Sequence, residues 1–236
     1  LYLASVLEEM GDAVQVVDYT AEPFTMHALT QRVRGADLVG ITVLTPAVPH
    51  VKTIVESIKM IDPSLPVVVG GPHVTLFPRE ALSAVAADYA VEGDGEDAMR
   101  RLRDKILDGG NAPIPGVWAR TNTGIQSGPP AQPLSDLDVL PFPARHLVRS
   151  YAYGWTFDPR MKPGEFTSLI TSRGCPFACR FCSRTSVSAH RYRPRSIESI
   201  VRELQAIADA GYHSVAVMDD CFPPPRDRAH ALFDAV

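Results

Sequence analysis

The stretch T-S-R-G-C-P-F-A-C-R-F-C-S, residues Thr171 to Ser183, holds three of the four cysteines of this 236-residue chain. Cys175, Cys179 and Cys182 are spaced C-x-x-x-C-x-x-C, so three thiolates on one short loop can converge on a single inorganic centre. Residues 166–171 have the pattern of a strand, which would deliver Cys175 at its carboxyl end.

The residues after this loop continue with helix and strand patterns. Ser196 is a good N-cap, and the apolar stripe behind it predicts an amphipathic helix over 196–210. A second strand is expected at 213–218, ending at Asp219 and Asp220, and a further helix follows. Strand, loop, helix, strand and helix in this order predict the start of a parallel (β/α) barrel, whose chemistry is placed at the carboxyl ends of its strands.

The first half of the chain shows the same alternation of strand and helix. Its strands are continuous apolar runs, as expected when helices cover both faces of a sheet. The order predicts a doubly wound, flavodoxin- or Rossmann-like parallel sheet that lacks its first strand. Both ends of the chain fall inside helical patterns, so we expect a chain truncated at both ends. Strands are expected at 13–18, 38–43, 66–69 and 89–91, and helices at 1–10, 27–34, 48–61, 78–87 and 96–107.

Three of these strands end in short polar or glycine-bearing segments. The carboxyl ends of parallel strands meet at one edge of a sheet, where such folds bind ligands. Each segment alone has an ordinary explanation, because threonines suit strand ends, paired glycines make turns and acids cap helices. The fingerprint G-x-G-x-x-G is absent, which disfavours NAD. The segments are Thr42-Val43-Leu44-Thr45, Gly70-Gly71-Pro72-His73 and Glu92-Gly93-Asp94-Gly95-Glu96.

Together these segments resemble the cobalamin (B12)-binding domain, over about residues 1–110. That family has a Ser/Thr-x-Leu element after one strand, a Gly-Gly after a later one and a Gly-Glu-Gly-Glu-like end, in which Asp94 replaces a Glu here. Its D-x-H-x-x-G motif, which supplies an axial histidine in some members, would precede Leu1. His73 is the only histidine near this edge, and a plain loop histidine is the alternative for it. The resemblance implies cobalamin contacts from Thr42, Leu44, Thr45, Gly70, Gly71, His73, Glu92, Gly93, Gly95 and Glu96.

The residues of the cysteine loop leave three kinds of centre open. Structural zinc needs a fourth ligand, which would be His190, Cys221 or a distant group. A redox C-x-x-C uses only the last two cysteines of the loop. A [4Fe–4S] cluster normally takes four cysteines, and held by three it keeps one iron open.

The loop resembles the radical SAM signature C-x-x-x-C-x-aromatic-C over residues 167–236. The resemblance implies that Cys175, Cys179 and Cys182 hold a [4Fe–4S] cluster whose open iron binds S-adenosylmethionine, with Phe181 beside the adenine. Asp219 and Asp220 stand where the family often has Gly-Gly-Glu at the methionyl amine. They depart from that motif, so capping of the following loop is an equal alternative to contact with S-adenosylmethionine.

The composition of the chain limits which kinds of partner are expected. The chain is 45% hydrophobic and 21% charged with a net charge of −4, which is ordinary for a globular protein and disfavours nucleic acid. No apolar run approaches the roughly 18 residues that span a bilayer, so no membrane partner is expected. Cysteine usage unlike a disulfide framework predicts a cytoplasmic setting. We expect the local group of arginines to screen the charge of the iron–sulfur cluster and of the S-adenosylmethionine carboxylate, and otherwise to lie on the surface in the ordinary way. This basic cluster comprises Arg173, Arg180, Arg184, Arg191, Arg193 and Arg195.

The expected domains are a cobalamin-binding domain (1–128), a Pro-rich linker (129–166) and the N-terminal part of a radical SAM domain (167–236). The combination looks like the cobalamin-dependent radical SAM family. It implies an enzyme that methylates an unactivated carbon of a small-molecule or peptide substrate, with electrons from a flavodoxin- or ferredoxin-type reductant. Two alternatives stay open: a radical SAM enzyme of other chemistry, cyclisation or methylthiolation, whose Rossmann-like domain is a platform without cobalamin, and a zinc-binding regulatory protein.

Overall fold

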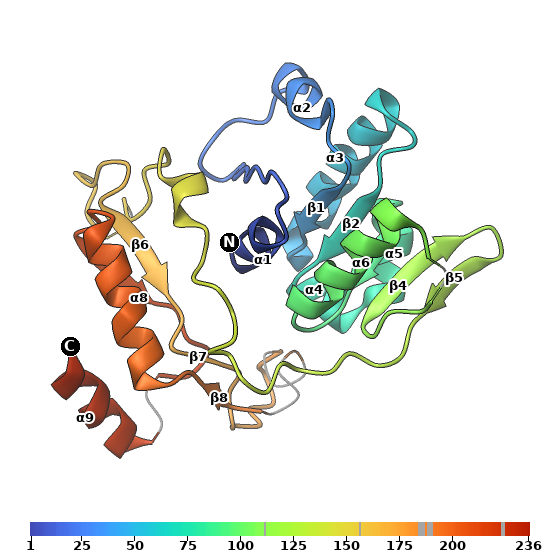
Figure 1. The fold of residues 1–236 in the computed structure, drawn as a ribbon. Helices are drawn as coiled ribbons and strands as arrows, with labels where there is room; N and C mark the ends of the chain where they lie inside the picture. Colours follow the sequence, from blue (N-terminus) through green and yellow to red (C-terminus); the bar gives the residue numbers. More distant parts are fainter. Residues whose placement is uncertain (111, 156, 184–186, 188–190, 223–224) are drawn as a thin grey trace. The chain divides into compact units, whose positions relative to one another are not determined.

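The computed structural model describes residues 1–110, 112–155, 157–183, 187, 191–222 and 225–236 (Figure 1). It divides into two compact units. The sheet unit is Pro23–Pro133, and the cysteine unit is Leu1–Glu22 together with Leu134–Val236. The first 22 residues therefore group with the second half of the chain, and most of the expected linker is packed into the cysteine unit. Among the described residues, no helix is long and apolar enough to cross a membrane.

The sheet unit is built on a five-stranded sheet in the order β1-β2-β3-β4-β5. The first three strands are parallel, and Val39 of β1 lies opposite Val67 of β2. The last two form a hairpin antiparallel to β3, which makes the sheet mixed. The strands are β1 (Val39–Thr42), β2 (Val67–Gly70), β3 (Tyr89–Val91), β4 (Val117–Thr121) and β5 (Gly124–Ser127).

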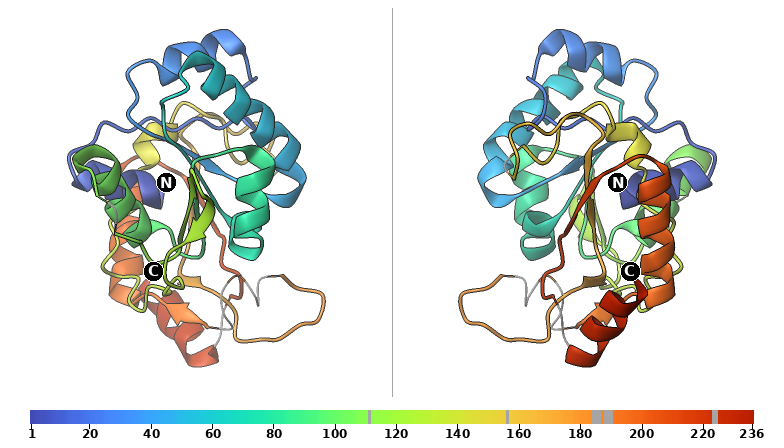
Figure 2. Two further views of the ribbon diagram at one scale, coloured as in Figure 1. Left: turned by 90° about the vertical axis from the view of Figure 1, so that its right-hand side faces the viewer. Right: turned by 90° about the vertical axis from the view of Figure 1, so that its left-hand side faces the viewer.

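Helices flank this sheet on both faces, which confirms the doubly wound α/β class (Figures 1 and 2). The alternation of β2 shows why: Val67 and Val69 join the core under α2, α3 and α5, whereas Val68 joins the core under α6. The short helix α4 was not expected from the sequence. The helical elements are α2 (Met26–Val33), η1 (Thr45–Ala47), α3 (Val48–Ile61), α4 (Pro72–Leu76), α5 (Pro78–Val85) and α6 (Glu96–Asp108).

The strand expected at 13–18 is wrong, because those residues form no strand. They belong to the cysteine unit, and side-chain bonds take the place of a strand ladder. Asp18 accepts hydrogen bonds from the Thr20 hydroxyl at 2.6 Å and the Tyr153 hydroxyl at 2.8 Å. An apolar alternation makes a strand only where a neighbouring strand pairs with it.

The cysteine unit contains two parallel strands joined through a helix, as expected for the start of a barrel. Phe166 of β6 lies opposite Ser214 of β9, and α8 packs on them through Ile200 and Ile207. Helix α1 packs through the fully buried Val6. The elements are α1 (Tyr2–Glu9), η2 (Arg145–Val148), β6 (Phe166–Leu169), β7 (Ser172–Arg173), β8 (Arg193–Pro194), α8 (Ile197–Asp209), β9 (Ser214–Val217) and α9 (Arg226–Ala235).

Candidate functional site

The expected ligand edge of the sheet unit is formed by the three loops that follow β1, β2 and β3, and we call these loops the rim. The first two loops are fastened together by backbone bonds: the Val43 amide donates to the Gly70 carbonyl at 2.8 Å, and the His73 amide donates to the Val43 carbonyl at 3.1 Å. The Thr45 hydroxyl and Nδ1 of His73 are 3.1 Å apart. Thr42, Leu44 and Thr45 are exposed, so the first loop presents side chains to solvent.

The two glycines at the end of β2 differ in what surrounds them. Gly71 has φ +96°, and a Cβ there would lie 3.0 Å from Cγ2 of Thr42 and 3.2 Å from the Val43 amide, so only glycine fits. A Cβ on Gly70 would meet only the Val91 carbonyl, at 3.6 Å, which is ordinary contact. The protein's own atoms therefore explain the glycine at 71, whereas they would tolerate a Cβ at 70.

The third loop is anchored from inside the sheet unit. The Glu92 carboxylate accepts hydrogen bonds from Nε1 of Trp118 at 3.1 Å and from the Ala131 amide at 3.2 Å. Glu96 is buried at the start of α6, and Gly93 is exposed with φ +74°. The structure thus brings all the predicted rim residues to one edge, with the two glutamates directed into the protein.

Thr75 connects the second and third rim loops, and it was not among the residues predicted from the sequence. Its hydroxyl donates to the Gly71 carbonyl at 3.1 Å and accepts from the Gly93 amide at 3.0 Å. A threonine four residues after a glycine in a helical turn is a common arrangement, so the sequence alone carried no signal for the second bond.

The cysteine loop follows β7 in the other unit. Cys175 and Cys182 are half-buried, Cys179 is exposed, and none of the three is in a disulfide. The Cys182 amide donates to the Cys179 carbonyl at 3.1 Å, which makes a turn between the last two cysteines. Phe181 is 93% exposed. Within the described ranges, no group of three or more His, Cys, Asp or Glu side chains is close enough to hold a metal ion, so the three thiols do not meet at one point.

Asp219 and Asp220 tie the end of β9 to the start of the cysteine loop. The Asp219 carboxylate accepts from the Thr171 amide at 2.7 Å and from the Ser172 hydroxyl at 2.6 Å. Asp220 accepts from the Gly174 amide at 3.2 Å. These bonds hold the start of the cysteine loop, whereas the capping alternative weighed from the sequence concerned the loop that follows Asp220.

Cys221 lies next to this pair. Desolvation, the adjacent Cys175 thiol and the carboxylates of Asp219 and Asp220 raise the pKa of the Cys221 thiol. Cys221 therefore favours its protonated form, which is the poorer metal ligand.

A buried ion network supports the strand that leads to the cysteine loop. Glu203 of α8 is fully buried and accepts hydrogen bonds from Arg145 and Arg195. Arg195 also donates to the Ile170 carbonyl at 3.0 Å, and Arg145 donates to the Ser168 carbonyl at 2.7 Å. We call Arg145, Glu203 and Arg195 the buried triad.

The expected surface placement of the basic cluster holds for Arg180 and Arg191, which are exposed, and is wrong for Arg195. Arg195 is 4% exposed, because it serves the buried triad, and the Arg173 guanidinium lies over the Tyr2 ring at 5.0 Å from its centre. Arg184 and His190 lie outside the described residues.

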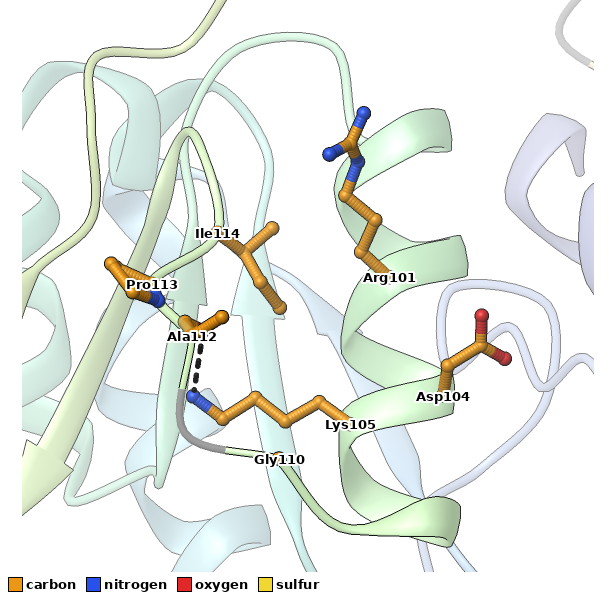
Figure 3. Close-up of a pocket in the computed structure, with 7 residues that line it drawn as sticks. All are labelled: Arg101, Asp104, Lys105, Gly110, Ala112, Pro113 and Ile114. Atoms are coloured by element: carbon orange, nitrogen blue, oxygen red, sulfur yellow. Dashed lines mark hydrogen bonds between the residues drawn. The ribbon is translucent and has the colours of Figure 1, made fainter.

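A hollow of about 300 Å³ lies away from the rim, at the end of α6 (Figure 3). Lys105 Nζ donates across it to the Ala112 carbonyl at 3.3 Å. Helix α6 starts at the third rim loop, and the lining of the hollow begins at Arg101, roughly 8 Å along the helix from its start at Glu96. Its lining residues are Arg101, Asp104, Lys105, Gly110, Ala112, Pro113 and Ile114.

Comparison with known proteins adds two family matches. Residues 1–103 match the sequence profile of the B12 binding domain, and residues 169–236 match that of the Radical SAM superfamily. An uncharacterised methyltransferase of Pyrococcus horikoshii is 31% identical over 97% of this chain and 49% of the relative. Cytidylyl-2-hydroxyethylphosphonate methyltransferase of Streptomyces wedmorensis is 26% identical over 99% of this chain and 52% of the relative. The chain spans about half the length of these curated relatives.

Solved structures give a consistent picture. The radical S-adenosylmethionine methyltransferase TsrM of Kitasatospora setae, bound to tryptophan and an analogue of S-adenosylmethionine, has a TM-score of 0.76 at 26% identity, covering 99% of this chain and 46% of TsrM. A second TsrM structure, 25% identical, holds cobalamin and a [4Fe–4S] cluster. OxsB shares the fold with a TM-score of 0.78 at 19% identity, over 99% of this chain and 33% of OxsB.

Proposed function

This chain belongs to the radical SAM proteins that carry a B12-binding domain, and from that premise we propose that it is part of a cobalamin-dependent radical SAM methyltransferase. The family assignment confirms both resemblances drawn from the sequence. The observation that carries the proposed activity is a loop of three cysteines, none of them in a disulfide, placed directly after the strand that leads into it.

Cys175, Cys179 and Cys182 would hold the [4Fe–4S] cluster. The donor set fits, since none of the three cysteines is in a disulfide and thiolates are the ligands that iron–sulfur clusters take. When bound, the cluster supplies an electron that cleaves S-adenosylmethionine, which starts hydrogen removal from a substrate carbon. The chain's own contribution is to place the thiols: Asp219 and Asp220 hold the first residues of the loop, and the exposed Phe181 is available to an adenine ring.

The rim would hold cobalamin, which supplies a carrier for the methyl group. The space beside Gly70 fits a flat ligand close to the backbone, because no protein atom there requires a glycine. Thr42, Leu44, Thr45 and His73 would contact it from the first two loops. Glu92 and Glu96, whose side chains serve the protein interior, would act by shaping the third loop.

The remaining partners follow from this chemistry. We propose a small-molecule or peptide substrate and a flavodoxin- or ferredoxin-type reductant, in a cytoplasmic setting where thiols stay reduced.

Anaerobic reconstitution with iron and sulfide tests the proposed cluster. We expect Cys175→Ala to abolish the absorption and bound iron of the cluster, and Cys221→Ala to retain both, because Cys221 lies outside the three-cysteine motif. Bound zinc without iron or sulfide would overturn the cluster and favour the zinc-binding regulatory alternative.

Two further measurements test the remaining parts of the proposal. Titration with hydroxocobalamin, followed by its absorption, tests the rim, and a protein that takes no cobalamin would favour the platform alternative. Incubation with S-adenosylmethionine and a reductant should release 5′-deoxyadenosine. Its absence from a protein with a full cluster would refute radical chemistry.

A further inference from the structure

Resting on the proposed cobalamin site, we propose that Thr75 is a positioning residue that sets the spacing of the second and third rim loops for the corrin. Nothing in the family matches assigns a role to this threonine. It acts through the backbone of two glycines and does not itself need to touch the ligand.

The geometry of one hydroxyl carries this inference. Oγ1 of Thr75 donates to the Gly71 carbonyl at 3.1 Å and accepts from the Gly93 amide at 3.0 Å. A single half-buried atom therefore uses its donor and an acceptor lone pair to join two loops that are 18 residues apart in the chain.

The loops need such a connection because the strand ladder stops before them. The register of β2 with β3 runs from Val68 opposite Tyr89 to Val69 opposite Ala90. Beyond that point Gly71 and Gly93 have φ +96° and +74°, and glycine backbone has the widest conformational freedom of any residue. The Thr75 hydroxyl fixes one peptide group in each loop, through the Gly71 carbonyl and the Gly93 amide.

The neighbouring bonds turn this link into a continuous brace. On one side the Val43 carbonyl accepts from the His73 amide, which ties the first loop to the helix that carries Thr75. On the other side Glu92, adjacent to Gly93, is held by Trp118 and by the Ala131 amide. The bond from the Gly93 amide to the Thr75 hydroxyl connects these two sets.

A rim held at fixed spacing favours binding of a broad rigid ligand, because the loops lose little freedom when it binds. Threonine suits this task better than serine, since its branched Cβ restricts the rotamers that aim the hydroxyl. The Thr75 link therefore contributes to cobalamin binding by holding the two loops in place beforehand, more than by touching the ligand.

Thr75→Val tests this role, because valine keeps the shape and removes the hydroxyl. We expect hydroxocobalamin to bind about tenfold more weakly to Thr75→Val, as for the loss of about one hydrogen bond. Exchange of the Gly93 amide with solvent should become faster. Thr75→Ser, which restores the hydroxyl, should recover most of the affinity and the protection of Gly93.

Thr30→Val is the matched control. The Thr30 hydroxyl also donates to the carbonyl four residues back, that of Met26 at 2.8 Å, but in α2 and without joining a second loop. It should bind hydroxocobalamin like the unaltered protein.

The outcomes separate this inference from the proposed function. Thr75→Val with unchanged affinity, or Thr75→Ser as weak as Thr75→Val, would overturn the positioning role while the cobalamin site stands. An unaltered protein that binds no hydroxocobalamin would overturn both.

Discussion

Replacing Glu203 with alanine should destabilise the cysteine unit by about 3–5 kcal/mol, the cost of removing one member of a buried ion pair. Glu203 is fully buried, and its arginine partners are 10% and 4% exposed, so the substitution leaves two guanidinium groups in a medium of low dielectric. Their remaining hydrogen bonds go to neutral groups, including the Ser168 and Ile170 carbonyls, and Arg195 retains a long ion pair with the Asp138 carboxylate at 4.0 Å, which compensates its charge only weakly.

Urea unfolding should be combined with native-state hydrogen exchange of the α8 amides, because two compact units can unfold separately. Glu198→Ala is the matched control on the same helix. Glu198 is exposed in the first turn, where it stabilises the helix by typically 0.3–1 kcal/mol.

The electrostatic explanation also makes a counter-prediction. Replacing the whole buried triad with apolar residues, Arg145→Met, Glu203→Leu and Arg195→Met, removes all the buried charge and should be far less harmful than Glu203→Ala alone. If Glu203→Ala costs no more than Glu198→Ala, or if the triple variant is the least stable of the set, the reasoning fails.

Four further predictions concern other parts of the chain. Gly71→Ala should destabilise the sheet unit by at least about 1 kcal/mol, because residue 71 has a positive φ and a Cβ there would lie 3.0 Å from Thr42. Gly70→Ala should leave the urea midpoint of the sheet unit unchanged and weaken hydroxocobalamin binding. Equal urea midpoints for the two variants would contradict this. Desolvation and the hydrogen bond to Asp18 raise the pKa of Tyr153, so its contribution to stability is present below about pH 10 and lost above it; Tyr153→Phe should flatten that alkaline loss in pH-dependent unfolding. Desolvation raises the pKa of Asp18, but hydrogen bonds from neighbouring hydroxyl and amide groups outweigh it and lower the pKa overall. Stability from Asp18 is therefore present above about pH 4 and lost below it, and Asp18→Asn should remove that acid dependence. Asp88→Ala should cost about 1–3 kcal/mol in urea unfolding, because its carboxylate accepts from Lys59 and a strand amide at 2.7 Å each; a loss no greater than for an exposed aspartate would argue against it.

Local pattern was sufficient for most elements. The short apolar run of β3 was placed at 89–91 and the long amphipathic helix α3 at 48–61, as the structure has them. Both carry their own signal, in the form of a buried run bounded by polar residues and an apolar stripe at helical spacing. The three cysteines and the rim glycines were visible for a similar reason, because motif spacing is a property of the chain itself.

The misses share a different cause, which is that their roles depend on partners far along the chain. Residues 13–18 have a strand-like alternation, but Asp18 bonds to Tyr153. Glu203 interrupts an apolar stripe, and only the positions of Arg145 and Arg195 make its burial tolerable. Thr75 is one threonine among several until Gly93 is seen beside it.

The anchoring of Ala131 bears on how this protein can change length during evolution. The polypeptide is fixed to Glu92 at Ala131, two residues before the sheet unit ends at Pro133. The Cα of Ala131 would also lie 3.3 Å from a side chain at Gly116, so the passage is tight. Insertions and deletions at 129–131 would therefore displace the third rim loop. The exposed hairpin tip at 122–123 can change length without moving that loop. Homologous sequences should accordingly differ in length at the hairpin tip. The rest of the segment between Gly116 and Ala131 should keep the same number of residues.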